Sequence, residues 1–195
     1  FDPDFMAVRA AIDEGSVGAV EMVVITSRDP GPPPASYIKV SGGIFRDMTI
    51  HDFDIARWLL GEEPVSVMAQ GSVLVDPEIA ALGDYDSVTV ILRTATGKQA
   101  VITNSRRASY GYDQRIEVHG STGMAAAANR HESTVEVAGA GGSARPPLLN
   151  FFMDRYAQAY ANEIAAFVRA VTEGTALPTT GEDGLKALLL ADAAV

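Results

Sequence analysis

The chain contains no cysteine among its 195 residues. Without thiols it can hold no disulfide framework, no thiolate nucleophile and no thiolate metal site. A chain that needs no disulfides suits a reducing compartment, so we expect a cytoplasmic protein.

Positive charge is also scarce, with 15 Lys and Arg against 25 Asp and Glu, a formal net charge of -10 and a pI near 4.7. The basic residues form no cluster longer than Arg106-Arg107. Because such a surface repels a phosphate backbone, we expect no nucleic-acid partner. The apolar stretches are interrupted by charge well short of the roughly 20 residues that span a bilayer, so we expect no membrane partner.

Two familiar motifs are missing. The glycine-rich run at residues 139–143 leads into Arg145-Pro146-Pro147 and does not open a helix after a buried strand, so it is not a dinucleotide-binding fingerprint. No Gly-x-Ser-x-Gly elbow of a serine hydrolase occurs. We therefore expect neither a phosphate-binding loop nor acyl-transfer chemistry in these residues.

What is present has the composition of one globular domain, 47% hydrophobic and 21% charged. Apolar periodicity and capping residues predict a short helix from Pro3 to Gly15, a block of strands, and helices again at the end. The predicted strands are 19–26, 65–75, 87–94, 99–106, 115–119 and 134–137, and the later helices are 48–60, 150–172 and one that begins after 180–182. This order predicts an α+β fold, an open and mainly antiparallel sheet with helices on one face.

The second face of that sheet is also expected to carry apolar side chains. Val88, Val90 and Leu92 alternate with Thr89 and Ile91, which leaves apolar area on both sides of the strand. We therefore expect the sheet to form a homo-oligomer interface.

The segment 41–58 holds the residues best suited to chemistry. At the helical spacing, His51 lies about 40° from Asp47, and Asp54 lies about 20° away on the other side, so the three share one face of a helix. Two carboxylates that flank an imidazole can fix its tautomer and stabilise its protonated form, as a general base requires. The preceding Gly42-Gly43 pair allows the backbone to approach a ligand closely.

Two alternatives remain open for this face. In a structural interpretation, Asp47 caps the helix, His51 pairs with it locally and Asp54 is a solvated charge. In a third interpretation the residues ligate a divalent ion, but no further His or Cys cluster completes such a site, and we expect no metal.

A second polar cluster lies in the turn at residues 110–115. Its tyrosine hydroxyls and amide can contact a polyhydroxylated ligand. His119, at a strand end, and His131, in a polar loop, are assigned no role.

Several segments together carry a family resemblance. They are Ser27-Arg28-Asp29-Pro30, Gly42-Gly43-Ile44-Phe45-x-Asp47-x-x-x-His51-x-x-Asp54, Tyr110-Gly111-Tyr112-Asp113-Gln114-Arg115 and the run from Asn150 to Tyr156. In this order they resemble the glucose-fructose oxidoreductase/inositol dehydrogenase (Gfo/Idh/MocA) superfamily, and its inositol branch in particular.

The resemblance implies that residues 1–195 form the C-terminal, substrate-binding and oligomerisation domain of a dehydrogenase. An N-terminal Rossmann domain that binds NAD and supplies a catalytic lysine would lie outside this chain, and dimers or tetramers would form through the sheet. The chain begins at Phe1 and ends inside an apolar helical run, so we expect a piece of a longer protein.

By the same resemblance, the enzyme oxidises a cyclic polyol such as myo-inositol. His51 would take the hydroxyl proton, Asp47 would orient the imidazole and the substrate, and Asp54 would hold a ring hydroxyl. The pocket would be lined by Tyr110, Tyr112 and Tyr156. The alternative is a stand-alone domain that binds sugar or mediates oligomerisation without catalysis.

Overall fold

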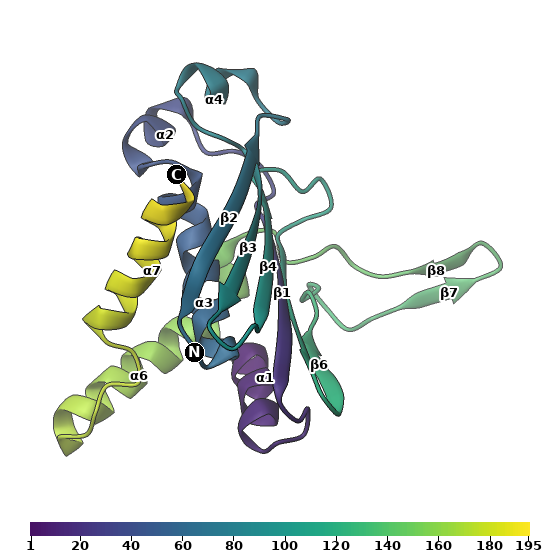
Figure 1. The fold of residues 1–195 in the computed structure, drawn as a ribbon. Helices are drawn as coiled ribbons and strands as arrows, with labels where there is room; N and C mark the ends of the chain where they lie inside the picture. Colours follow the sequence, from purple (N-terminus) through teal and green to yellow (C-terminus); the bar gives the residue numbers. More distant parts are fainter.

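A six-stranded sheet with helices along one side forms the body of the molecule in the computed structural model, which describes residues 1–195 (Figure 1). Its strands are β1 (Val20–Arg28), β2 (Pro64–Ser72), β3 (Ser87–Thr94), β4 (Gln99–Ser105), β5 (Asp113–Gly120) and β6 (Gly123–Ala127). The helices are α1 (Pro3–Asp13), α2 (Ala35–Ser41), η1 (Phe45–Thr49), α3 (Ile50–Leu60), α4 (Pro77–Ala81), α5 (Phe152–Arg155), α6 (Ala157–Glu173) and α7 (Gly181–Ala194).

The strand order is β2-β3-β4-β1-β5-β6, and every neighbouring pair is antiparallel except β1 with β4. The parallel pair arises because β1 and β4 are separated by four helices and two further strands, long enough for the chain to cross back over the sheet. The predicted α+β architecture with a mainly antiparallel sheet is confirmed.

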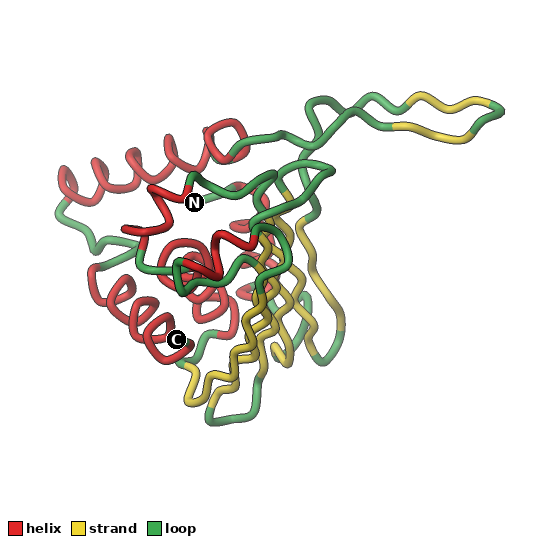
Figure 2. Tube along the Cα trace, turned by 90° about the horizontal axis from the view of Figure 1, so that it is seen from above, coloured by secondary structure: helices red, strands yellow, loops and turns green.

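The core lies between the sheet and its helices. Val88, Val90 and Leu92 of β3 are buried, and they meet the apolar stripe of α3, which includes Phe53 and Leu59. Seen from above, the helices lie together on one side of the strands (Figure 2). The prediction that helices cover one face is therefore confirmed.

The opposite face of the sheet is uncovered. Met68, Ile91, Val101 and Val24 stand in register across β2, β3, β4 and β1, and we call this set the uncovered row. Met68 is 70% exposed and Ile91 39% exposed. Apolar side chains on the second face are thus confirmed, while the interface they would form stays a prediction.

Two predicted elements differ from those observed, and one observed strand was not predicted. The strand at 134–137 is found instead as β7 (Val137–Gly139), which pairs with β8 (Gly142–Ala144) in an arm that projects from the sheet (Figure 1). The helix at 150–172 is broken at Tyr156 into α5 and α6. Strand β6 was not predicted, because its alanines favour a helix and only pairing with β5 makes them a strand.

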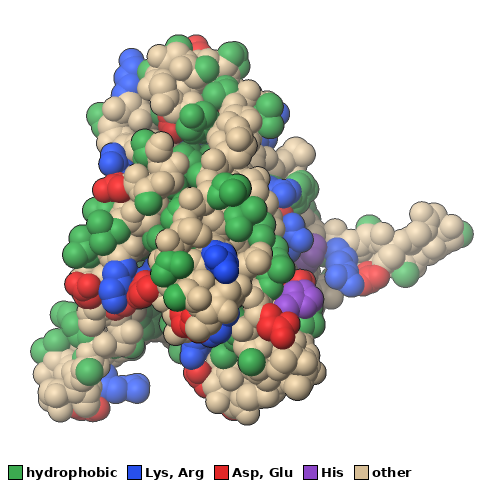
Figure 3. Space-filling view, in the orientation of Figure 1, with side chains coloured by type: hydrophobic (Ala, Val, Ile, Leu, Met, Phe, Trp, Pro, Cys, Tyr) green, Lys and Arg blue, Asp and Glu red, His purple; other side chains and the backbone are tan.

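The helix predicted at 48–60 begins earlier, because residues 45–49 form a π-helical turn that runs directly into α3. The loop at 30–34 contains no helix or strand, as its prolines predicted, but α2 follows it unpredicted. No helix has both the length and the apolar character needed to cross a bilayer. On the face seen in Figure 3, Lys and Arg side chains are scattered among Asp and Glu and form no continuous basic patch.

Candidate active site

The candidate site lies at one edge of the sheet. Strands β1 and β4 end at this edge, and β3 and β5 begin there, because Arg28 pairs with Asp113 and Ser87 pairs with Ser105. Helix α3 packs on β1 and β4, and η1 contacts β4. Residues far apart in the sequence are therefore brought together here.

Asp47, in η1, is held by two donors from other elements. Its Oδ1 accepts a hydrogen bond from the Tyr37 hydroxyl at 2.5 Å, and its Oδ2 accepts one from Arg106 Nη1 at 3.0 Å. It neither caps a helix nor forms a hydrogen bond with His51, so these two parts of the structural interpretation are wrong. The π-helical turn at residues 45–49 departs from the 3.6-residue period on which the shared face of Asp47, His51 and Asp54 was calculated, and that shared face stays a prediction.

His51 and Asp54 lie in the first turns of α3. The imidazole is exposed, makes no hydrogen bond within the chain and so has both ring nitrogens available. Burial raises the pKa of Asp54, while Arg57 and, more weakly, His51 oppose that shift, which places the imidazole and this carboxyl in one neighbourhood. Asp54 also accepts a hydrogen bond from Arg57 Nη1 at 3.1 Å.

Asp52 is a buried acid that the sequence argument missed. It is only 6% exposed, and its Oδ2 accepts a hydrogen bond from Asn104 Nδ2 at 2.6 Å, while Thr49 donates to Asn104 Oδ1 at 2.7 Å. Burial raises the pKa of Asp52 to about 7. A signal was present, since Asp52 precedes Ala56 and Leu59 at helical spacing and therefore lies on the apolar face.

Tyr112 and Tyr156 pack edge to face, with ring centroids 6.1 Å apart. The Tyr156 hydroxyl donates to Gln114 Oε1 at 3.2 Å, and the Ser27 hydroxyl donates to the same oxygen at 3.1 Å. Burial raises the pKa of both tyrosines, and Asp52 contributes to each shift. The structure thus brings these two predicted residues to the same edge as α3.

Tyr110 lies apart from that pair and is half-exposed. Its hydroxyl donates to Asp113 at 2.5 Å and accepts from Arg28 at 3.0 Å. Asp113 is fully buried and also bonds Arg115 at 2.7 Å and Asn129 at 2.6 Å. Tyr110 borders a hollow of about 560 Å³ at the base of the β7–β8 arm.

Asp29 follows β1 directly and belongs to one of the segments that carry the family resemblance. Burial raises its pKa to about 6, Arg106 opposes the shift, and Asp47 adds to it. Asp29 therefore lies beside the Arg106–Asp47 pair.

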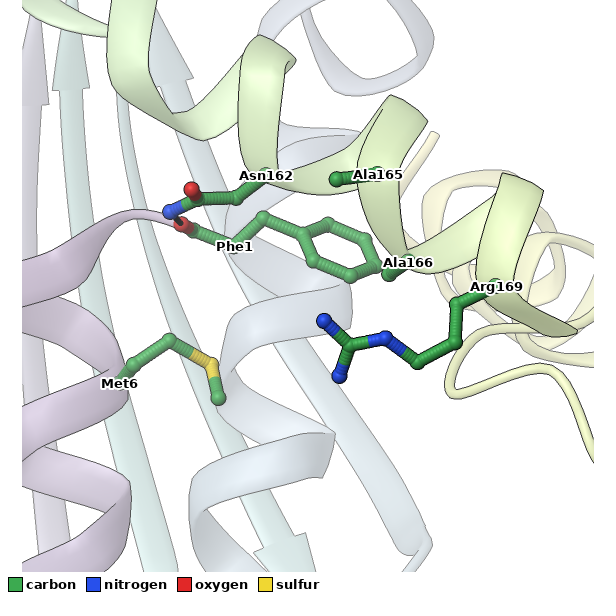
Figure 4. A pocket seen from close by; sticks show the side chains of 6 residues that line it. All are labelled: Phe1, Met6, Asn162, Ala165, Ala166 and Arg169. Carbon is green, nitrogen blue, oxygen red and sulfur yellow. Dashed lines mark hydrogen bonds between the residues drawn. The ribbon is translucent and has the colours of Figure 1, made fainter.

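A separate hollow of about 300 Å³ lies between α1 and α6, where Phe1 and Met6 face Ala166 and Arg169 (Figure 4). None of the predicted site residues lines it. No three His, Asp or Glu side chains are grouped so that they could hold a metal ion.

Comparisons of the sequence and of the structure with known proteins identify the same family. Residues 5–126 match the sequence model of the GFO/IDH/MocA C-terminal domain. An inositol 2-dehydrogenase of Rhizobium meliloti (strain 1021) is 66% identical over 195 residues, which are 100% of this chain and 59% of that protein. The chain thus spans about three fifths of the length of this curated relative.

Solved structures agree with the sequence match. A myo-inositol dehydrogenase from Corynebacterium glutamicum has a TM-score of 0.96 at 46% identity, over 100% of this chain and 58% of that one. A scyllo-inositol dehydrogenase from Lactobacillus casei, with bound NAD(H) and scyllo-inositol, has a TM-score of 0.89 at 30% identity, over 99% of this chain and 58% of that one. The chain belongs to the GFO/IDH/MocA family and matches its C-terminal domain.

Proposed function

We propose that this chain is the substrate-binding domain of an oxidoreductase that oxidises a cyclic polyol, myo-inositol above all, to the keto product with NAD as the hydride acceptor. The observation that carries the proposal is the exposed imidazole of His51, free of hydrogen bonds, beside Asp54 at the sheet edge where Asp47, Tyr112 and Tyr156 also gather. The names of the relatives support the substrate class.

The proposed site residues have different roles, which follow from the chemistry of their side chains. A nitrogen of His51 takes the proton of the reacting hydroxyl, since a general base must reach that proton directly. Asp47, fixed by Tyr37 and Arg106, supplies a negative charge close to the reacting group and the imidazole. Asp54 accepts a hydrogen bond from another ring hydroxyl, and Tyr110, Tyr112 and Tyr156 line the pocket.

The cofactor does not fit the residues of this chain. Its glycine-rich turn joins β7 to β8 in an exposed arm and does not connect a strand to a helix N-terminus, so it offers no cradle for a pyrophosphate. We infer that a separate Rossmann domain of the full-length protein binds NAD and supplies the lysine that completes the proton network. NAD bound by that domain would supply the acceptor for the hydride of the hydroxyl-bearing carbon.

We further propose that the full-length protein works in the cytoplasm as a homodimer or homotetramer. The uncovered row supports the proposed oligomer, because an apolar stripe across four strands is unusual for a sheet face that stays in water.

The direct test is a substrate panel on the full-length protein. Purified enzyme is given myo-inositol, scyllo-inositol or glucose with NAD or NADP, and formation of the reduced nicotinamide is followed by absorbance. We expect the highest kcat/KM with myo-inositol and NAD. Saturable inositol binding without turnover under any condition would favour the non-catalytic alternative and contradict the proposal.

A further inference from the structure

The Asp47 carboxylate is held at both of its oxygens. Tyr37 of α2 donates to Oδ1, and Arg106, just after β4, donates to Oδ2. One hydrogen bond leaves a carboxylate free to turn about it, whereas two donors on different oxygens fix its plane. The orientation of Asp47 is therefore set by residues outside its own helix.

Arg106 is the buried donor to Asp47. Its side chain is 1% exposed, and its Nη2 lies 3.7 Å from Asp84 Oδ2. Asp84 in turn accepts a hydrogen bond at Oδ1 from the backbone N–H of Ile44, the residue that precedes η1, at 2.9 Å. The guanidinium thus joins Asp47 to the start of its own π-helical turn, and moving it would leave two carboxylates without a counter-ion.

Tyr37 is the half-exposed donor to Asp47. It lies on the short helix α2, of which only Ile38 is buried, and its side chain is half-exposed. The bond to Asp47 raises the pKa of Tyr37, as expected for a phenol that donates to a carboxylate. Loss of this hydroxyl removes one donor from Asp47 without opening the core.

We propose that Tyr37 and Arg106 are positioning residues, which act through Asp47 to hold its carboxylate in place. This inference rests on the proposed function, since it assigns roles within that same site.

The experiment is a double-mutant cycle in the full-length enzyme, with Tyr37→Phe, Asp47→Asn and the double variant. Tyr37→Phe should lower kcat about 10-fold, with KM for myo-inositol changed by less than about twofold. A residue that acts only through Asp47 has no further effect once that carboxylate is gone. The double variant should therefore lie within about twofold of Asp47→Asn in kcat.

Tyr85→Phe is the matched control. Tyr85 is also half-exposed and its ring packs against Phe45 of η1, but its hydroxyl makes no hydrogen bond. This variant should retain the wild-type kcat. Arg106→Lys should keep at least about 10-fold more turnover than Arg106→Gln, because a lysine retains the charge beside Asp47 although it loses the fork of donors.

A deuterium isotope effect separates positioning from loss of folded enzyme. With myo-inositol deuterated at the oxidised carbon, the isotope effect on kcat should rise in Tyr37→Phe, because a misplaced carboxylate slows the chemical step itself. A kcat loss in Tyr37→Phe with an unchanged isotope effect would overturn the inference, as would an equal loss in both backgrounds of the cycle. Failure of the proposed function is distinguishable, since the wild-type enzyme itself would then show no turnover of myo-inositol with NAD.

Discussion

His51 and Asp52 are consecutive in the sequence and lie in opposite environments. The imidazole of His51 is exposed and unbonded, whereas the carboxyl of Asp52 is buried and bonded to Asn104. The turn of α3 separates them, because neighbouring residues of a helix point about 100° apart. His51 faces solvent, whereas Asp52 ties α3 to β4 through Asn104.

The ionisation of Asp52 should make the stability of the folded protein depend on pH. Burial raises its pKa from 3.8 to about 7. Between about pH 4 and 7 the folded protein therefore holds a proton there that the unfolded chain releases, so this contribution to stability falls as the pH rises through that window. Asp52→Asn, which stays neutral, should flatten this part of the curve of Tm against pH by about 5 °C in the full-length protein. If the curves of Tm against pH were parallel for the wild type and Asp52→Asn, Asp52 would be ionised over this whole pH range and the prediction would be wrong.

Arg155 and Asp2 form a buried ion pair between positions 153 residues apart in the sequence. Their Nη1 and Oδ2 atoms lie 2.5 Å apart, and Asp2 also caps α1 by accepting from Phe5 N at 3.1 Å. Removing one partner of a buried pair leaves a charge uncompensated, which costs roughly 3–5 kcal/mol. Arg155→Met should therefore lower Tm by about 10 °C, measured by calorimetry. The control Arg145→Met breaks an exposed pair with Glu136 and should shift Tm by less than about 2 °C.

The oligomer should depend on the uncovered row. Met68→Glu places a charge at its most exposed residue, and in a symmetric interface the two introduced charges would be buried together. We expect the dissociation constant measured by sedimentation velocity to rise at least about 100-fold, because unpaired charges at an interface cost several kcal/mol. Leu74→Glu, at another exposed apolar residue, should leave association unchanged. A wild-type protein that sediments as a monomer at micromolar concentration would refute the interface.

Local signals in the sequence account for most of the fold. Asp2-Pro3 marked the start of α1 as N-cap and first helical residue, and the Asp2 side chain indeed accepts from Asp4 N and Phe5 N. The alternation of apolar and polar residues in β3 predicted both where the strand begins and ends and which of its side chains face the core, and the structure confirms both. Both patterns are determined by residues a few positions apart, where periodicity and capping act.

Long-range contacts explain what the sequence did not predict. The alanines of β6 become a strand only through β5. Arg106 lies 59 residues from Asp47, and nothing in its own surroundings marks it as the donor that fixes that carboxylate. The sequence also gives no signal of the π-helical turn at residues 45–49, which departs from the 3.6-residue period used to place Asp47 and His51 on one face.

His51 is the residue that we propose as the general base. The most direct test of this role is the steady-state kinetics of His51→Ala in the full-length enzyme with myo-inositol and NAD, beside His119→Ala, which removes an exposed imidazole paired with Glu117. We expect kcat to fall by roughly 100-fold or more for His51→Ala, the usual scale for loss of a general base. The kcat of His119→Ala and the Tm of both variants should stay near the wild-type values. A His51→Ala enzyme with near-normal kcat would contradict this role.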